Sequence, residues 1–256
     1  MHQFSLFFLM VPLLLFSYVD SDMDGVEDKD DMCSNTLMTD LVDLKGCTIQ
    51  SLLSPHHFSV MAGISYAEDS DSSYIFSTLE FDYYYKKFSL QLSSSYYDLT
   101  TDISNNEGLN DTNLNLFYRF NPLENLSLKL GAGVLMPTYD RVDNKTDYST
   151  SLYGQYYFDK WSLSTGVGYR FVGDTNASNI LFYNVSTAYN WNSEFYSSLG
   201  YYVSESIYAN VDNFESLSLY NYYNMSENWF GTLTLTQGVS PESLDNSLGV
   251  KLGYYW

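Results

Sequence analysis

Most of the chain, from residue 57 onward, consists of segments of about ten residues in which apolar and polar side chains alternate. A period of two indicates β-strands that present one apolar face, because successive side chains point to opposite faces. Turn-forming residues separate the segments. The pattern predicts twelve strands, at 57–67, 74–85, 87–97, 112–120, 126–136, 148–158, 161–171, 179–189, 195–204, 214–223, 229–237 and 247–256. The phase of 214–223 is ambiguous.

Strand length and turn rhythm favour a membrane barrel over a soluble secreted β-sandwich, which is the alternative. Strands of about nine to eleven residues suit a tilted bilayer crossing. Tight connections alternate with longer ones, as in barrels with short periplasmic turns and longer outer loops. All four tryptophans fall at predicted periplasmic turns or at the terminus, where an indole can meet both hydrocarbon and headgroups. We therefore expect an all-β fold, a transmembrane antiparallel up-and-down β-barrel of about twelve strands over 57–256.

The last strand has one apolar face and one small or polar face, and it ends in an aromatic residue. This ending resembles the C-terminal strand signal of bacterial outer-membrane β-barrels. The resemblance implies that Leu252, Tyr254 and Trp256 form an assembly signal read by the barrel assembly machinery. It also implies residence in the bacterial outer membrane, in contact with its lipid and lipopolysaccharide. Both termini would then be periplasmic, which requires an even number of strands.

The N-terminus carries an apolar run from Phe4 to Phe16. This run is too short for a membrane helix, which needs about 20 residues, and it fits the apolar region of a signal peptide, expected over 1–17. The two cysteines, Cys33 and Cys47, follow in the exported part of the chain. They favour a disulfide over a zinc site, since no histidine or further cysteine lies close enough to complete a metal set.

An aspartate-rich loop occupies residues 20–31. Its expected calcium ligands are side chains at relative positions 1, 3, 5, 9 and 12 and a backbone carbonyl at position 7: Asp20, Asp22, Asp24, Asp28, Asp31 and Val26. Gly25 at position 6 permits the sharp turn. An EF-hand is rejected, because the last position lacks the longer glutamate and little chain precedes the loop to form an entry helix.

The spacing of these aspartates, followed by a cysteine and by the segment 42–47, resembles the thrombospondin type 3 repeat. That resemblance covers about 28 residues and implies a calcium-binding module, placed at 18–50, with a cysteine pair nearby. Calcium is the cofactor that it implies. An acidic solvated linker is the alternative.

Composition excludes some functions. The net charge of −20 argues against a nucleic-acid partner, whose phosphates would be repelled. The only histidines are His2, His56 and His57, and they leave no base for a serine nucleophile on the outer side, so we expect no enzyme activity.

Charged residues on the predicted lumen face are candidates for ion selectivity: Glu80, Asp82, Arg119, Lys129 and Arg170. Glu80 and Asp82 either pair with a lumen cation, Lys251 included, or act as free selectivity charges. In the second case, together with acidic outer loops, they would make the pore prefer cations. Small lumen residues such as Gly166, Gly168 and Ser198 leave room inside twelve strands, or only relieve crowding.

Transport of small solutes by a porin-like channel is the first functional hypothesis. The segment 166–171 is loosely similar to strands of small-substrate transporter barrels. A structural or envelope-tethering barrel of the OmpA type, without transport, is the second hypothesis, and an outer-membrane hydrolase is the third.

Overall fold

The computed structural model describes residues 21, 22, 26, 28–36, 40–51, 56–70, 72–101, 104–140, 144–208 and 210–256. The chain divides into two units, Met1–Pro55 and His56–Trp256, each described by itself. The expected signal peptide, Asp20 and Asp24 lie outside the described residues. No helix in the described ranges is long and apolar enough to cross a membrane.

The smaller unit contains one disulfide and one two-stranded sheet. Strand β1 (Asp40–Val42) pairs antiparallel with β2 (Thr48–Ser51). Cys33 and Cys47 are joined with an S–S distance of 2.04 Å, so the disulfide expected from the sequence is present.

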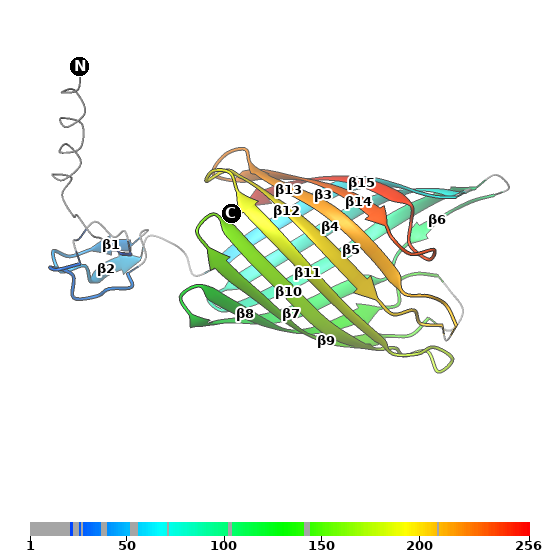
Figure 1. Ribbon diagram of the computed structural model, residues 1–256, viewed down its shortest axis with the longest axis horizontal. Helices are drawn as coiled ribbons and strands as arrows, with labels where there is room; N and C mark the ends of the chain where they lie inside the picture. The colour runs from blue at the N-terminus through cyan, green and yellow to red at the C-terminus, as the bar shows by residue number, and fades with distance from the viewer. Residues whose placement is uncertain are drawn as a thin grey trace, which may run out of the picture. The chain divides into compact units, whose positions relative to one another are not determined.

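The larger unit is built from antiparallel strands (Figure 1). Their bounds are β3 (His56–Asp69), β4 (Ser72–Tyr85), β5 (Phe88–Thr101), β6 (Asn105–Leu109), β7 (Thr112–Leu123), β8 (Leu126–Met136), β9 (Asp147–Phe158), β10 (Trp161–Phe171), β11 (Ile180–Asn190), β12 (Phe195–Ser204), β13 (Phe214–Asn224), β14 (Trp229–Gly238) and β15 (Asn246–Tyr255). Every strand from β7 to β15 pairs with its sequence neighbour.

Pairing of β15 with β3 closes the sheet, because β3–β4, β4–β5 and β5–β7 complete the ring. Twelve strands form this ring, and β6 pairs only with the end of β5. The predicted fold class is thus confirmed. Several details differ from the sequence prediction: β6 was expected as loop, and β3 already begins at His56 and includes His56 and His57. The β3–β4 connection, residues 70 and 71, is also tight rather than long.

One face of each strand carries large exposed apolar side chains, and the opposite face carries mostly polar or small ones. Leu116, Leu163 and Val167 are 49%, 49% and 45% exposed on the apolar face. The phase of β13 is now defined: Leu217 and Leu219 are on this face, whereas Tyr220 and Tyr222 are on the other. A closed ring with this alternation has a lipid-compatible outside and a polar lumen.

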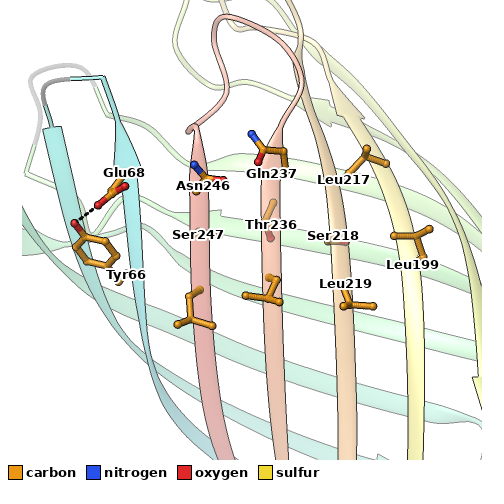
Figure 2. Close-up of a pocket in the computed structure, with 12 residues that line it drawn as sticks. Tyr66, Glu68, Leu199, Leu217, Ser218, Leu219, Thr236, Gln237, Asn246 and Ser247 are labelled. Atoms are coloured by element: carbon orange, nitrogen blue, oxygen red, sulfur yellow. Dashed lines mark hydrogen bonds between the residues drawn. The ribbon is translucent and has the colours of Figure 1, made fainter. Parts of the chain in front are cut away.

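The apolar outer face gives way to polar groups near the end of the barrel that carries the longer loops, here called the loop end. A shallow cavity of about 430 Å³ on the outside shows this change (Figure 2). Leu199, Leu219 and other leucines line it, while the hydroxyl of Tyr66 donates to Glu68 at 2.6 Å along its polar side. The apolar belt therefore ends at this level.

The opposite end of the barrel, here called the turn end, carries the tight turns and the C-terminus. All four tryptophans lie in or beside these turns or at the terminus and are 44–56% exposed. Trp256 stacks on Phe58 at 5.7 Å between ring centroids, and its backbone exchanges hydrogen bonds with that residue. The terminal aromatic thus fastens the closing strand pair.

We predict that Leu252→Arg prevents assembly, because Leu252 is exposed on the outer face of the closing strand and a lipid-facing arginine costs about 2–4 kcal/mol near the membrane midplane. Heat-modifiable gel migration measures the folded fraction. Ser93→Arg, on the lumen face of β5, is the matched control and should fold. Equal migration of the two variants would contradict the assignment of faces.

Candidate functional site: the charged lumen

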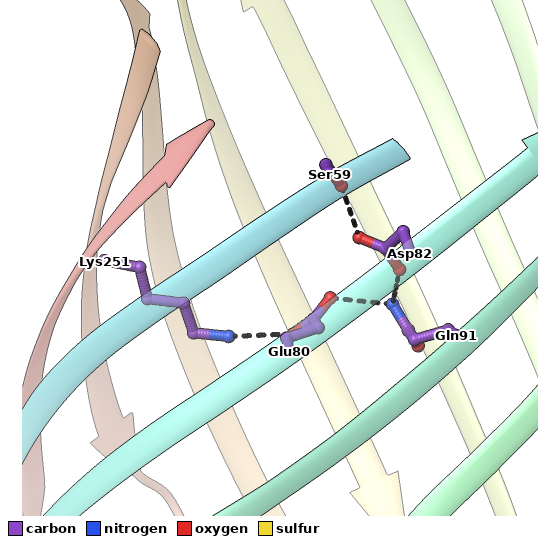
Figure 3. Close-up of polar contacts among 5 residues, drawn as sticks. All are labelled: Ser59, Glu80, Asp82, Gln91 and Lys251. Atoms are coloured by element: carbon purple, nitrogen blue, oxygen red, sulfur yellow. Dashed lines mark hydrogen bonds and ion pairs between the residues drawn. The ribbon is translucent and has the colours of Figure 1, made fainter. Parts of the chain in front are cut away.

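Glu80 and Asp82 lie side by side on the lumen face of β4 and are both engaged by neighbours (Figure 3). The amide of Gln91 donates to Glu80 at 2.7 Å and to Asp82 at 3.1 Å. The hydroxyl of Ser59 donates to Asp82 at 2.9 Å, and Asp82 is only 3% exposed. Lys251 forms an ion pair with Glu80 at 3.2 Å. The paired alternative from the sequence is therefore the one observed, and its cation is Lys251.

Lys251 reaches Glu80 by crossing the intervening strand β3. The residue opposite Lys251 on β3 is Gly63, and a Cβ there would meet Cγ of Lys251 at 2.5 Å. Only glycine leaves space for the lysine side chain to lie across the wall at this point. The ion pair is therefore a product of strand register and of one glycine.

Three cations occupy a different part of the lumen wall, on β7, β8 and β10. Arg119 and Lys129 are directly opposite each other in the β7–β8 pair. Lys129 lies over the rings of Phe117 and Tyr153, at 4.4 and 5.2 Å from their centroids. Within the described residues, neither Arg119 nor Arg170 makes a hydrogen bond or ion pair through its side chain. None of these three cations forms an ion pair with a carboxylate of the described residues.

Glycines on the lumen face of β10 let neighbouring side chains lie close to the wall. A Cβ at Gly166 would meet the Tyr153 ring at 2.3 Å and the amide oxygen of Asn184 at 2.4 Å, and a Cβ at Gly168 would meet Phe182 at 2.1 Å. The rings from β9 and β11 therefore lie over β10 rather than projecting into the lumen. Glycine here both relieves crowding and leaves space.

Two cavities lie along this wall. The larger, of about 450 Å³, is here called the β9–β12 recess, and its lining includes Tyr153, Arg170, Phe182, Asn184, Ser186, Ser198, Gly200, Tyr202 and Ser218. The smaller, of about 200 Å³, includes Arg119, Ser127, Lys129 and Gln155. They share Tyr153 and Asn184, so they form neighbouring parts of one polar, basic surface.

An aromatic cluster covers the lumen wall near the turn end, on β12 to β15. Tyr222 stacks on Tyr196 at 5.2 Å and on Phe230 at 5.4 Å, and Phe230 stacks on Tyr255 at 4.4 Å. The hydroxyls of Tyr222 and Tyr255 are hydrogen-bonded. These contacts give one wall of the turn end a rigid aromatic surface.

Several acidic residues at the loop end accept hydrogen bonds from backbone groups. Asp147 accepts from the N–H of Gly173 at 2.8 Å, and Glu205 accepts from the N–H of Leu181 at 2.8 Å. Asp111 and Asp245 accept likewise from Tyr139 and Ser70, at 2.9 and 3.1 Å. These carboxylates hold neighbouring loops and strand ends together.

The aspartate-rich loop of the smaller unit is described in part. Asp28 accepts from the backbone N–H and the hydroxyl of Ser21, each at 2.7 Å, and Asp31 accepts from the N–H of Cys33 at 2.7 Å. Asp22 accepts from the N–H of Thr36 at 2.7 Å through Oδ2, whereas its Oδ1 is buried without a hydrogen-bond partner. The described residues contain no cluster of three potential metal ligands. Of the expected set, only Asp22, Val26, Asp28 and Asp31 are described.

A turn closed by Asp43 supports the disulfide in the same unit. Its Oδ1 accepts from the N–H groups of Lys45 at 2.8 Å and Cys47 at 3.1 Å. These bonds to the ionised carboxylate lower the pKa of Asp43. The turn is therefore stabilised by the ionised form, and that contribution fades as the pH falls through the lowered pKa.

The structure separates the five lumen charges that the sequence singled out. Glu80 and Asp82 lie on β4, whereas Arg119, Lys129 and Arg170 lie on β7, β8 and β10, beyond the intervening strand β5. The expected cation preference requires Glu80, Asp82 and the acidic outer loops to outweigh Arg119 and Arg170, and both of these carboxylates are engaged by neighbouring side chains. Sequence reasoning missed Tyr153, Phe182 and Asn184, although alternation from the outward Leu152 and Tyr183 places them on the lumen face.

Comparisons with known proteins place the fold. No family model matches the chain, and no curated protein matches it in sequence. An outer-membrane channel of Pseudomonas putida F1 is similar in structure, with a TM-score of 0.66 at 9% identity, over 78% of this chain and 95% of that one. The NanC porin has a TM-score of 0.54 at 12% identity, over 77% and 98%. The KdgM porin has a TM-score of 0.51 at 13% identity, over 77% and 98%. The chain thus has the fold of outer-membrane barrels of this kind.

We predict that Lys251→Met destabilises the barrel, because the Glu80 side chain, which is only 13% exposed, loses its cation. Denaturant titration of the refolded barrel measures the free energy of unfolding. In the double variant with Glu80→Gln, part of the loss should return, with a coupling energy of about 1 kcal/mol. Strictly additive losses would show that the pair does not stabilise the wall.

Proposed function

We propose that this protein is a porin-like channel of the bacterial outer membrane that passes small solutes. The observation that carries the proposal is the pair of cavities along the lumen wall, of about 450 and 200 Å³, bordered by cations without carboxylate partners. In a barrel without a transport function, we would expect such lumen charges to be paired or absent, because an unpaired charge next to a medium of low dielectric constant is destabilising.

Two further features support this proposal. The outer face carries the apolar belt and the tryptophans of a membrane barrel. The similar structures include a channel and two porins. None of these features calls for a catalytic group, and a non-enzymatic role is part of the proposal. Contacts with lipid, lipopolysaccharide and the assembly machinery, and periplasmic termini, belong to the same proposal.

The arrangement of charges favours anions in the lumen. Lys251 neutralises Glu80, and Asp82 is buried beneath Ser59 and Gln91. Arg119, Lys129 and Arg170 face the lumen, and no carboxylate of the described residues forms an ion pair with them. Charges of one sign that line a narrow pore raise the local concentration of the opposite ion. We therefore infer anion preference, in place of the cation preference expected from the sequence.

Purified protein in a planar bilayer should give discrete conductance steps and a reversal potential on the anion side, most clearly at low salt, where screening is weakest. Arg119→Gln with Arg170→Gln should move the reversal potential toward cations. Lys87→Gln with Lys160→Gln removes the same charge from the turns and should move it less.

The outcomes separate the candidate functions. A folded barrel without conductance steps would favour the structural, envelope-tethering function. If the barrel conducts but its reversal potential is the same with and without Arg119 and Arg170, the channel function stands and these arginines do not explain its selectivity.

We also propose that the aspartate-rich loop binds calcium. The buried Oδ1 of Asp22 supports this, because a carboxylate oxygen that lacks a donor is a ready ligand for a hard cation. Asp28 and Asp31 keep free lone pairs beside their present hydrogen bonds. The thrombospondin type 3-like spacing supplies the rest of the ligand set, with Asp20, Asp24 and the carbonyl of Val26.

Calorimetry on the full-length protein should detect a calcium site of millimolar or tighter affinity. Asp22→Ala should weaken it at least about tenfold, since a charged ligand is removed. Asp30→Ala removes the same charge from the same loop at a position outside the ligand pattern and should retain most of the affinity. Equal calcium heats in the two variants would remove the assignment.

A further inference from the structure

The β9–β12 recess combines groups that a binding site for one particular class of solute requires. We propose that it is a binding site for a small carboxylate that carries several hydroxyl groups, such as a sugar acid. This inference rests on the proposed function, because the recess would lie within the conducting lumen. It adds a substrate class to that function.

Arg170 supplies the group that would recognise a carboxylate. It is the only charged residue among the described residues that line the recess, and its guanidinium makes no hydrogen bond or ion pair with them. A guanidinium presents paired N–H donors that match the two oxygens of a carboxylate. The guanidinium is therefore available to bind a solute, because it is not paired with a residue of the described wall.

Four polar side chains supply groups that would recognise hydroxyls. Asn184, Ser186, Ser198 and Ser218 line the recess, and no hydrogen bond joins any of these side chains to another described residue. Hydroxyl and amide groups both donate and accept, so they can bind a solute that carries hydroxyls in either sense. An aromatic or aliphatic acid would displace their water without replacing the hydrogen bonds, which lowers its affinity.

Aromatic rings provide the apolar part of the site. Tyr153 and Phe182 lie over Gly166 and Gly168, so each ring borders the recess as a flat wall. A sugar ring has an apolar C–H face as well as hydroxyls, and this face suits a flat aromatic surface. The recess volume of about 450 Å³ is within the range of small-ligand sites.

Glycine and serine also keep the opposite side of the recess open. A Cβ at Gly200 would approach the Ser218 hydroxyl at 3.3 Å and Ser186 at 3.4 Å, much less closely than at Gly166 or Gly168. The space above β12 is thus not taken up by neighbouring side chains. A larger residue at Ser198 would fill it without changing the charge of the lumen.

The test compares glucuronate, glucose and benzoate by saturation-transfer NMR on the purified full-length barrel in detergent, which does not require conductance. We expect saturation by glucuronate, with weaker binding of glucose, which lacks the carboxylate, and of benzoate, which lacks the hydroxyls. Arg170→Gln should weaken glucuronate binding at least about tenfold. Ser198→Leu should weaken it by filling the recess.

Arg119→Gln is the matched control, since it removes the same charge from the lumen outside the recess. It should change the glucuronate dissociation constant by less than about threefold, through long-range attraction only. Equal effects of the two arginine variants would reduce the site to general attraction of anions and overturn the proposal.

A parallel conductance measurement separates this inference from the channel itself. Glucuronate should reduce the chloride current of the unchanged protein in a saturable way, and Arg170→Gln should raise the half-blocking concentration. A conducting barrel that binds glucuronate no better than glucose or benzoate would overturn the recess as a sugar-acid site and leave the channel intact. Binding without conductance would retain the site and overturn the channel.

Discussion

The closed ladder of backbone hydrogen bonds is the constraint on which the rest of the barrel depends. Hydrocarbon offers no partner for N–H and C=O groups, so a sheet in a bilayer must have no open edge. Strand β15 satisfies this by pairing with both β14 and β3, although β3 is nearly 200 residues away in sequence. Once the ring is closed, each side chain faces either outward or inward, and alternation along the chain follows.

The closed ring also limits the space inside, and the wall packing decides how that space is used. Long inward side chains that pointed toward the axis would narrow a lumen surrounded by twelve strands. Glycines at register-matched positions let them lie along the wall instead, as Lys251 does over Gly63 and Tyr153 does over Gly166. Glycines at these positions therefore allow the Lys251–Glu80 ion pair to form and leave the basic wall accessible.

The outward face could be predicted from the sequence, because lipid contact imposes a period of two on each strand separately. The terminal strand and the tryptophans at the turn end follow from the same requirement. Strand β6 was not predicted because Asn105–Leu109 is mostly polar and shows no alternation of apolar and polar residues. It pairs only with the end of β5 and is not one of the twelve strands of the ring.

The lumen contacts could not be predicted in this way, because they depend on register between strands far apart in the chain. The choice of Lys251 as the partner of Glu80 joins residues 171 positions apart and also requires Gly63 between them. Arg119 and Lys129 were recognised as lumen charges, but alternation alone does not show whether a carboxylate lies within reach. The disulfide could be predicted because the sequence holds only two cysteines, and no histidine or further cysteine lies close enough to them to complete a metal site.

The strongly negative net charge of the protein does not determine the electrostatics of its lumen. Some of the carboxylates at the loop end accept hydrogen bonds from backbone N–H groups, as Asp147 and Glu205 do. Inside the barrel, the β4 carboxylates bind Lys251, Gln91 and Ser59, whereas the cations of β7, β8 and β10 form no ion pair with any described carboxylate. Two cations directly opposite each other destabilise a strand pair unless an anion or water separates their effects. Such a wall suits the anion preference proposed above, because the few residues that face the lumen, rather than the overall charge, are nearest to a solute inside it.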